Sequence, residues 1–150
     1  MNHRDLHYLL LLGHQRTTKR IAAQTRKEGL MPGQPKILEF LLEHDQCNQK
    51  EIALGCALDK STVTSLLGRM AEEDLVVRVT SEGDRRLSLV GLTEKGRKYA
   101  ARVRDICAAV DEYAWRDIAP EDRETFLRVF RQLLDNLEEP SVRKESAETQ

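Results

Sequence analysis

The stretch Asn48–Arg97, NQKEIALGCALDKSTVTSLLGRMAEEDLVVRVTSEGDRRLSLVGLTEKGR, decides the fold of this 150-residue chain. It begins with Asn48, which is followed three residues later by Glu51, the spacing of a capping box at a helix N-terminus. Cys47 and Ile52 flank the box as a hydrophobic staple. The pattern predicts a short helix, which we expect Gly55 to interrupt.

A second short helix follows at once, with Asp59 as its N-cap. Val63, Leu66, Leu67 and Met70 recur at helical spacing and predict one buried face. The other sides carry small hydroxyl residues and two cations, namely Lys60, Ser61, Thr62, Thr64, Ser65 and Arg69. Two capped helices joined by a tight turn form a helix-turn-helix, whose second helix enters the major groove of DNA. We therefore predict that these six residues contact bases or phosphates.

A β-hairpin is predicted next, from the β-prone runs Leu75–Val79 and Leu87–Leu92 joined by a turn of six to seven residues. Its tip carries Asp84, Arg85 and Arg86. A turn needs Gly or Asp, but it does not need two guanidinium groups. The arginines therefore indicate a partner, and a solvated run of charge is the structural alternative.

Long helices are expected on both sides of this stretch. Residues 4–28 have helical apolar spacing and end at Gly29, which suits a left-handed cap. Two prolines bracket the start of the following helix, as is typical of a first helical turn. Thr93 is placed to cap a long fifth helix, and Pro120 to begin the last one.

The predicted fold is mainly α with a small β-hairpin, a winged helix-turn-helix domain flanked by long dimerisation helices. We expect one domain over residues 1–139. The winged helix-turn-helix occupies about residues 30–100, the dimerisation helices about residues 4–28 and 93–138, and residues 140–150 are expected to form a disordered tail.

Composition narrows the class of protein. The net charge is −1, but residues 14–27 carry five Lys and Arg side chains and no acid, which is compatible with a nucleic-acid partner. No run approaches the roughly 18 apolar residues of a membrane span, so we expect a cytoplasmic protein with no membrane partner. The three cysteines, Cys47, Cys56 and Cys107, fit neither a disulfide framework nor a zinc site.

The same stretch resembles the multiple-antibiotic-resistance regulator (MarR) family of bacterial transcription factors, strongly over about residues 30–100. The most specific part is D-x-R at Asp84 and Arg86, followed by the LTEKG-like run that contains Thr93 to Gly96. The resemblance implies a two-fold dimer built by the first, fifth and sixth helices, and a wing arginine in the DNA minor groove. Arg86 is then the minor-groove residue, Asp84 its orienter and Arg85 a phosphate contact.

Two positions depart from the family pattern. Asp74 stands where the family usually has Gly after the recognition helix, and Asp tolerates the left-handed conformation better than most residues. Pro35 stands where the family often has an aromatic residue that lines its ligand cleft, which weakens any inference about the ligand.

The predicted function is a sequence-specific, homodimeric DNA-binding regulator, a repressor that binds a pseudo-palindromic operator and is released by a ligand. The alternative is a winged-helix protein-interaction module without DNA binding. No pattern of nucleophile, base or paired carboxylates argues for an enzyme, and no cofactor is expected.

Ligand and metal sites rest on weaker patterns. By analogy, a small aromatic or acidic effector would bind between the first two helices and the DNA-binding lobe, near His14, Arg16 and Arg20. His3 and His7 have the i, i+4 spacing of metal ligands, although surface histidines are the simpler interpretation and no metal is expected. Oxidant sensing by a cysteine is left open, because a reactive thiol needs an electropositive, accessible setting.

Overall fold

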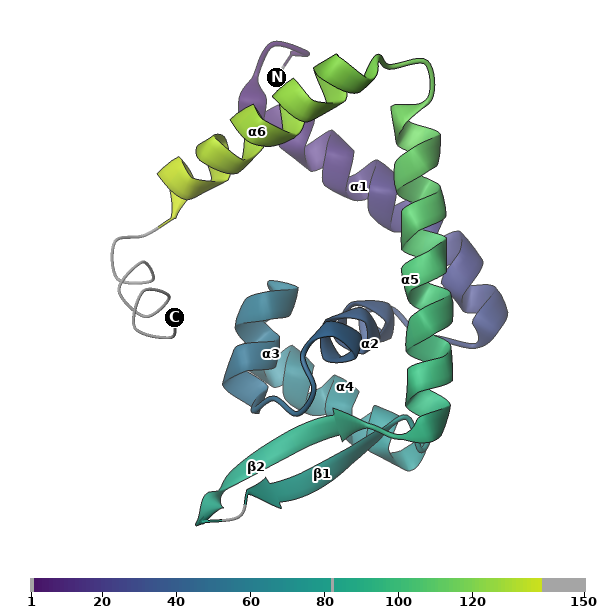
Figure 1. The fold of residues 1–150 in the computed structure, drawn as a ribbon, viewed down its shortest axis with the longest axis vertical. Helices are drawn as coiled ribbons and strands as arrows, with labels where there is room; N and C mark the ends of the chain where they lie inside the picture. The colour runs from purple at the N-terminus through teal and green to yellow at the C-terminus, as the bar shows by residue number, and fades with distance from the viewer. Residues whose placement is uncertain (1, 82, 139–150) are drawn as a thin grey trace. The chain divides into compact units, whose positions relative to one another are not determined.

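The computed structural model describes residues 2–81 and 83–138. The chain divides into two compact units, Met1–Asp111 and Glu112–Gln150, which are described separately. The first unit holds four α-helices, most of a fifth and the hairpin, in the order drawn in Figure 1.

The first helix, α1 (Leu6–Thr25), continues into a short 3-10 turn, η1 (Arg26–Glu28). Gly29 ends it with a φ of +79°, in the left-handed region. A glycine adopts this conformation without steric cost, and the predicted cap is confirmed. After a short loop, α2 (Gln34–Glu43) begins with Pro35 in its first turn.

The capping box of α3 (Gln49–Cys56) is confirmed. The backbone N–H of Asn48 donates to Glu51 Oε2 at 2.9 Å, and the N–H of Glu51 donates to Asn48 Oδ1 at 2.9 Å. The expectation that Gly55 interrupts this helix is wrong, because the helix passes through it to Cys56. A Cβ at position 55 would collide with the ring of Phe40, so glycine permits α2 and α3 to approach closely.

Asp59 caps α4 (Lys60–Glu72), as predicted. The chain then turns at Asp74, whose φ of 59° confirms that an aspartate takes the left-handed position. Thr93 joins this turn to α5 (Glu94–Trp115): its hydroxyl donates to the carbonyl of Asp74 at 2.6 Å and accepts from the N–H of Gly96 at 2.9 Å.

The hairpin consists of β1 (Val76–Ser81) and β2 (Asp84–Leu92), paired antiparallel with Val76 opposite Leu92. The strands run further toward the tip than the sequence predicts, so the turn is shorter than six residues. The register shifts between Thr80, which faces Ser88, and Ser81, which faces Asp84. On the other side of β2, Cys47 exchanges two backbone hydrogen bonds with Val90, at 3.0 and 2.7 Å.

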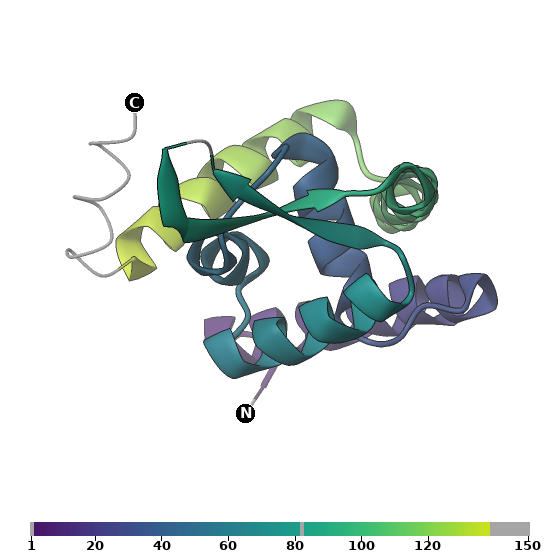
Figure 2. The same cartoon turned by 90° about the horizontal axis from the view of Figure 1, so that it is seen from below.

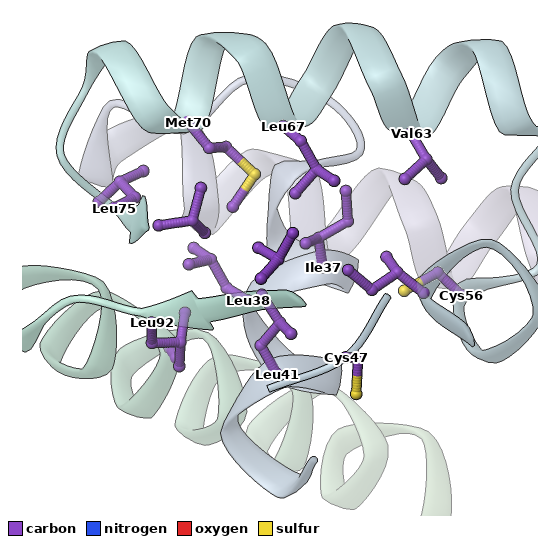
Figure 3. Packing of buried hydrophobic residues seen from close by; sticks show 14 of the residues in the cluster. Ile37, Leu38, Leu41, Cys47, Cys56, Val63, Leu67, Met70, Leu75 and Leu92 are labelled. Carbon is purple, nitrogen blue, oxygen red and sulfur yellow. The ribbon is translucent and has the colours of Figure 1, made fainter. Parts of the chain in front are cut away.

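The hydrophobic core lies between α2, α3, α4, the hairpin and the first half of α5 (Figure 3). Its largest fully buried apolar side chains are Ile37, Leu38, Leu41, Ile52, Val63, Leu67, Met70, Leu75, Val90 and Val103. Cys47 and Cys56 are buried in the same core, as expected for small apolar residues.

The second unit is formed by α6 (Pro120–Leu137) and the end of α5. Trp115 packs edge-on against Phe126, with ring centroids 5.6 Å apart, and Arg123 Nη1 pairs with Glu112 Oε1 at 2.9 Å. The structure describes every residue of α6, and none of them is buried. Phe126, Val129, Leu134 and Leu137 are between 49% and 64% exposed. No helix in the described part of the chain is long and apolar enough to cross a membrane.

Candidate nucleic-acid interface

The helix α4 lies at the same end of the first unit as the hairpin (Figures 1 and 2). Its outer face is polar. Val63, Leu67 and Met70 point into the core, where all three are almost completely buried. The predicted contact residues of the helix lie on the opposite sides: Lys60, Ser61, Thr64, Ser65 and Arg69 are exposed, and Thr62 is partly exposed. The helix therefore presents a row of small hydroxyl side chains, Ser61, Thr62, Thr64 and Ser65, between two cations.

Three hydrogen bonds converge on the carboxylate of Asp59 at the start of α4. Oδ1 accepts from the backbone N–H of Thr62 at 2.8 Å and from the hydroxyl of Ser61 at 2.6 Å. Oδ2 accepts from the hydroxyl of Thr62 at 2.6 Å. These bonds, the Ser61 hydroxyl first, hold the pKa of Asp59 well below its usual range. Asp59 is therefore ionised at neutral pH and fixes both hydroxyls.

A second chain of hydrogen bonds connects α4 to α3 and the hairpin. The Thr64 hydroxyl donates to the carbonyl of Lys60 at 3.0 Å and accepts from Gln49 Nε2 at 3.0 Å. Gln49 Oε1 in turn accepts from Arg78 Nη1 at 3.4 Å. Gln49 and Arg78 were not predicted from the sequence, because their position beside α4 depends on how α3 and β1 pack.

A shallow hollow lies along α4. It is lined by Met31 and Pro32 from the loop before α2 and, from α4, by Ser61, Thr62, Ser65, Leu66 and Arg69. Met31 is 47% exposed there. Because the loop borders the hydroxyl row, it belongs to the same surface, and nothing in the local sequence signalled this.

Asp84, Arg85 and Arg86 lie on β2, at its tip end. Their side chains are outside the part of the chain that the structure describes. The roles predicted for the two arginines and the aspartate therefore stay predictions.

A cavity of about 400 Å³ lies in the first unit, enclosed mainly by α1, α2 and the loop that precedes α2. Apolar and small residues line most of it, together with His14, Arg26, Lys36, Glu39 and Cys107. Of the three residues predicted for an effector, His14 lines the cavity, whereas Arg16 and Arg20 are not among its described lining residues. The cations at the cavity are Arg26 and Lys36 instead. Neither cation was predicted from the sequence, and nor was Glu39, because these residues belong to different elements.

Burial raises the pKa values of two groups that line this cavity, Glu39 and Cys107. It raises the pKa of Glu39, with repulsion from Glu43 and Asp111 adding to the effect and a hydrogen bond with Cys107 opposing it. Burial also raises the pKa of the Cys107 thiol to about 12, and the nearby charge of Glu39 contributes. Within the core, burial raises the pKa of Cys56 to about 11. Both thiols are therefore protonated at neutral pH.

Over residues 2–81 and 83–138, no group of three or more His, Cys, Asp or Glu side chains is placed to hold a metal ion. His3, one of the two histidines that have the spacing of metal ligands, lies with its ring centroid 5.9 Å from that of Tyr8.

Comparison with known proteins agrees with this geometry. The profile of the MarR family matches residues 28–87. The organic hydroperoxide resistance transcriptional regulator of Bacillus subtilis is 32% identical over 102 residues, which are 68% of this chain and 69% of that protein. The chain belongs to the MarR family. The chain spans about two thirds of the length of the first curated relatives that it matches.

Solved structures extend the likeness to almost the whole MarR fold. A MarR family regulator from Silicibacter pomeroyi is 26% identical with a TM-score of 0.77, over 89% of this chain and 95% of that one. MepR of S. aureus, solved in complex with DNA, is 20% identical with a TM-score of 0.80, over 88% and 98%. The predicted fold class is confirmed: α3 and α4 form the helix-turn-helix of a MarR-type winged-helix transcriptional regulator, and β1 and β2 form its wing.

Proposed function

We propose that this MarR family protein is a homodimeric repressor that binds a pseudo-palindromic operator and is released by a small ligand. The observation that carries the DNA-binding part is the outer face of α4, a row of hydroxyl side chains between Lys60 and Arg69. Small hydroxyl side chains let a helix lie deep in the major groove, where they can bond to base edges or phosphates.

The cations suit the phosphate backbone. Lys60 and Arg69 are exposed at opposite ends of the hydroxyl row, where they would contact the two sides of the groove. Arg86, oriented by Asp84, is proposed for the flanking minor groove, and Arg85 for a phosphate. The MepR structure, a complex with DNA, supports this use of the fold.

Dimerisation is supported by the apolar residues that the second unit leaves exposed. Phe126, Val129, Leu134 and Leu137 are each at least 49% exposed on one helix. Clusters of this kind mark interfaces, and a two-fold partner would cover them with the same surface of its own. Two recognition helices related by two-fold symmetry would bind half-sites about one helical turn of DNA apart, or a multiple of it.

The ligand part of the proposal rests on the cavity beside α1 and α2. Its volume of about 400 Å³ falls within the range of small-molecule sites. Apolar walls with Arg26, Lys36 and His14 among them suit an aromatic acid. A ligand that binds one arrangement of the dimer better would shift the population between DNA-competent and DNA-incompetent states.

The DNA-binding part is tested by selecting bound duplexes from a random pool. We expect a pseudo-palindrome with two equivalent half-sites, and affinity that falls steeply with salt. If the protein enriches no sequence and binds random DNA no better than an unrelated acidic protein does, the DNA-binding proposal is wrong. The interaction-module alternative would then be the better account.

The ligand part is tested with two matched variants of α1. Ala22 lines the cavity, and its neighbour Ala23 is exposed and does not. A set of aromatic acids of the salicylate type is titrated against the protein–operator complex. We expect some to release wild-type protein and Ala23→Phe, whereas Ala22→Phe, whose ring fills the cavity, keeps its operator. Release of all three proteins at equal ligand concentration would place the ligand elsewhere.

A further inference from the structure

The hydroxyl groups at the start of α4 have a fixed hydrogen-bonding direction. A hydroxyl has one proton to donate and two lone pairs that accept. Ser61 and Thr62 both direct that proton at the carboxylate of Asp59, at 2.6 Å in each case. Distances of 2.5–2.7 Å are typical of charge-assisted O–H···O⁻ bonds, which are about twice as strong as neutral ones.

The donor and the acceptor in these two hydrogen bonds are fixed. Ionised Asp accepts hydrogen bonds and donates none, so the two hydroxyls must be the donors in both contacts. The lowered pKa of Asp59 keeps it ionised at neutral pH. Turning either proton toward DNA would break a charge-assisted bond and leave a carboxylate oxygen next to a polyanion. What Ser61 and Thr62 offer to a partner is therefore their lone pairs.

The geometry points to Asp59 as a positioning residue that makes Ser61 and Thr62 act as hydrogen-bond acceptors toward DNA, so that they select the exocyclic amino groups of adenine or cytosine. In the major groove these amino groups are the only base donors, whereas guanine and thymine present acceptors there. Phosphate oxygens are acceptors too, so the same constraint excludes phosphates as partners of these two hydroxyls. The inference rests on the proposed DNA binding of α4 and adds the direction of its readout.

The variant Asp59→Asn tests this inference at Thr62. Because Asn is as good an N-cap as Asp, the start of α4 should be retained. In Asp59→Asn, the amide oxygen must stay on the backbone N–H of Thr62, where Asp59 Oδ1 now accepts at 2.8 Å. The amide NH₂ then takes the place of Oδ2 and donates to the Thr62 hydroxyl. That hydroxyl becomes free to donate to DNA, while Ser61 keeps its bond to the oxygen.

The experiment compares operators selected from random DNA by wild-type protein and by Asp59→Asn. The expected result is that one position in each half-site changes from adenine or cytosine to guanine or thymine. Glu72→Gln is the control, since it removes the same charge from an exposed residue of the same helix. It should leave the selected sequence unchanged, and thermal melting should show that both variants fold.

Base analogues give a second, independent measurement on the wild-type operator. Purine and 2-pyrimidinone replace adenine and cytosine without their amino groups, and 7-deazaguanine removes an acceptor from guanine. Loss of the amino group read by Thr62 should weaken wild-type binding on the order of ten-fold, as expected for one good base contact. Thr62→Val should bind the two duplexes almost equally, which separates the protein contact from any effect on base pairing.

The possible outcomes distinguish a failure of this inference from a failure of the proposed function. If the protein selects an operator but Asp59→Asn selects the same bases, the acceptor assignment is wrong while DNA binding stands. The acceptor assignment is also overturned if the base contacted by Thr62 responds to 7-deazaguanine and not to the loss of an exocyclic amino group. If wild-type protein selects no DNA at all, the proposed function and this inference fail together.

Discussion

Gln34 and Glu73 are joined by a hydrogen bond of 3.1 Å, from Gln34 Nε2 to Glu73 Oε2, although they lie 39 residues apart. The Gln34 side chain is completely buried, and its Oε1 accepts from the backbone N–H of Met31 at 2.9 Å. The loop before α2 is thereby tied to the end of α4. Since Pro32 of this loop lines both the cavity and the hollow beside α4, one short segment touches both proposed binding sites.

Replacing Gln34 with Ala should destabilise the protein. The change removes both hydrogen bonds of a completely buried side chain, and a typical hydrogen bond contributes about 0.5–1.5 kcal/mol. Urea unfolding should show a lower free energy of unfolding with an unchanged m-value. Gln24→Ala is the control, because Gln24 is exposed and makes one long contact of 3.4 Å with Lys27. Equal stability of the two variants would mean that the buried amide contributes nothing.

Adding a methyl group at Gly55 should be costly. In Gly55→Ala the new Cβ collides with the Phe40 ring, and overpacking of this kind costs about 1–3 kcal/mol. Gly68→Ala is the matched control in a neighbouring helix, because nothing lies within 4 Å of its Cβ position. Alanine there should stabilise α4 by roughly 0.5–1 kcal/mol. In thermal melts without DNA the two variants should shift in opposite directions, and adding Phe40→Leu should rescue Gly55→Ala.

Local signals made much of this fold predictable from the sequence. The Asn48–Glu51 box, the Asp59 cap and the Gly29 stop each act within four residues, and each is where the sequence places it. The buried face of α4 follows from its apolar spacing alone. Gly55 was misinterpreted because a glycine in a helix has two explanations, and the choice depends on Phe40 from another helix.

The candidate sites were predictable only in part, for the same reason. The hydroxyl row is contiguous on one helix, so a periodic pattern is enough to find it. The cavity instead combines Arg26, Lys36 and Cys107, which come from three separate elements. The bond from Gln34 to Glu73 and the chain from Arg78 to Thr64 likewise depend on packing. Composition and spacing carry no signal for such contacts.

The thiol of Cys107 should react slowly with alkylating reagents at pH 8. The thiolate is the reactive form, and a thiol with an ordinary pKa of about 8.5 is roughly one quarter ionised at that pH. With a pKa raised to about 12, Cys107 is almost entirely protonated. Its alkylation rate, followed by mass spectrometry of peptides, should keep rising well above pH 9. Glu39→Gln removes the nearby charge and should speed the reaction at pH 8. A fast, pH-independent reaction of wild-type Cys107 would contradict this prediction and favour oxidant sensing by this cysteine.

A charge on the apolar side of α6 should separate the proposed dimer. Leu134 is 49% exposed, and Leu134→Asp would place a carboxylate in the apolar interface that we propose. Sedimentation at micromolar concentration should show a dimer for wild-type protein and a monomer for this variant. Gln132→Asp adds the same charge on the same helix, at an exposed polar position. It should remain a dimer, whereas a monomeric wild-type protein would contradict both the dimer and the palindromic operator.

The two arginines of the wing should differ in their effect on DNA binding. Arg86→Ala removes the proposed minor-groove contact, which should cost on the order of 1–3 kcal/mol per site and weaken the preference for A·T-rich flanks. Arg85→Ala removes a proposed phosphate contact, so it should weaken binding to all sequences alike and reduce the salt dependence by about one ion. Fluorescence anisotropy with A·T-rich and G·C-rich flanks distinguishes them, and the assignment is reversed if Arg85→Ala is the variant that loses the preference.

Asp84→Asn gives a prediction whose sign is opposite to that of simple electrostatics. Loss of an acid near a polyanion should strengthen binding if only net charge matters. If Asp84 holds the guanidinium of Arg86 in one pose, its loss should weaken binding instead, because a neutral amide makes a weaker bond to the guanidinium. The double variant with Arg86→Ala isolates the effect, since Asp84 then has nothing to orient and its loss should help. Anisotropy at matched salt compares wild type, Asp84→Asn, Arg86→Ala and the double variant. Tighter binding by Asp84→Asn alone would show that Asp84 only tunes the local charge.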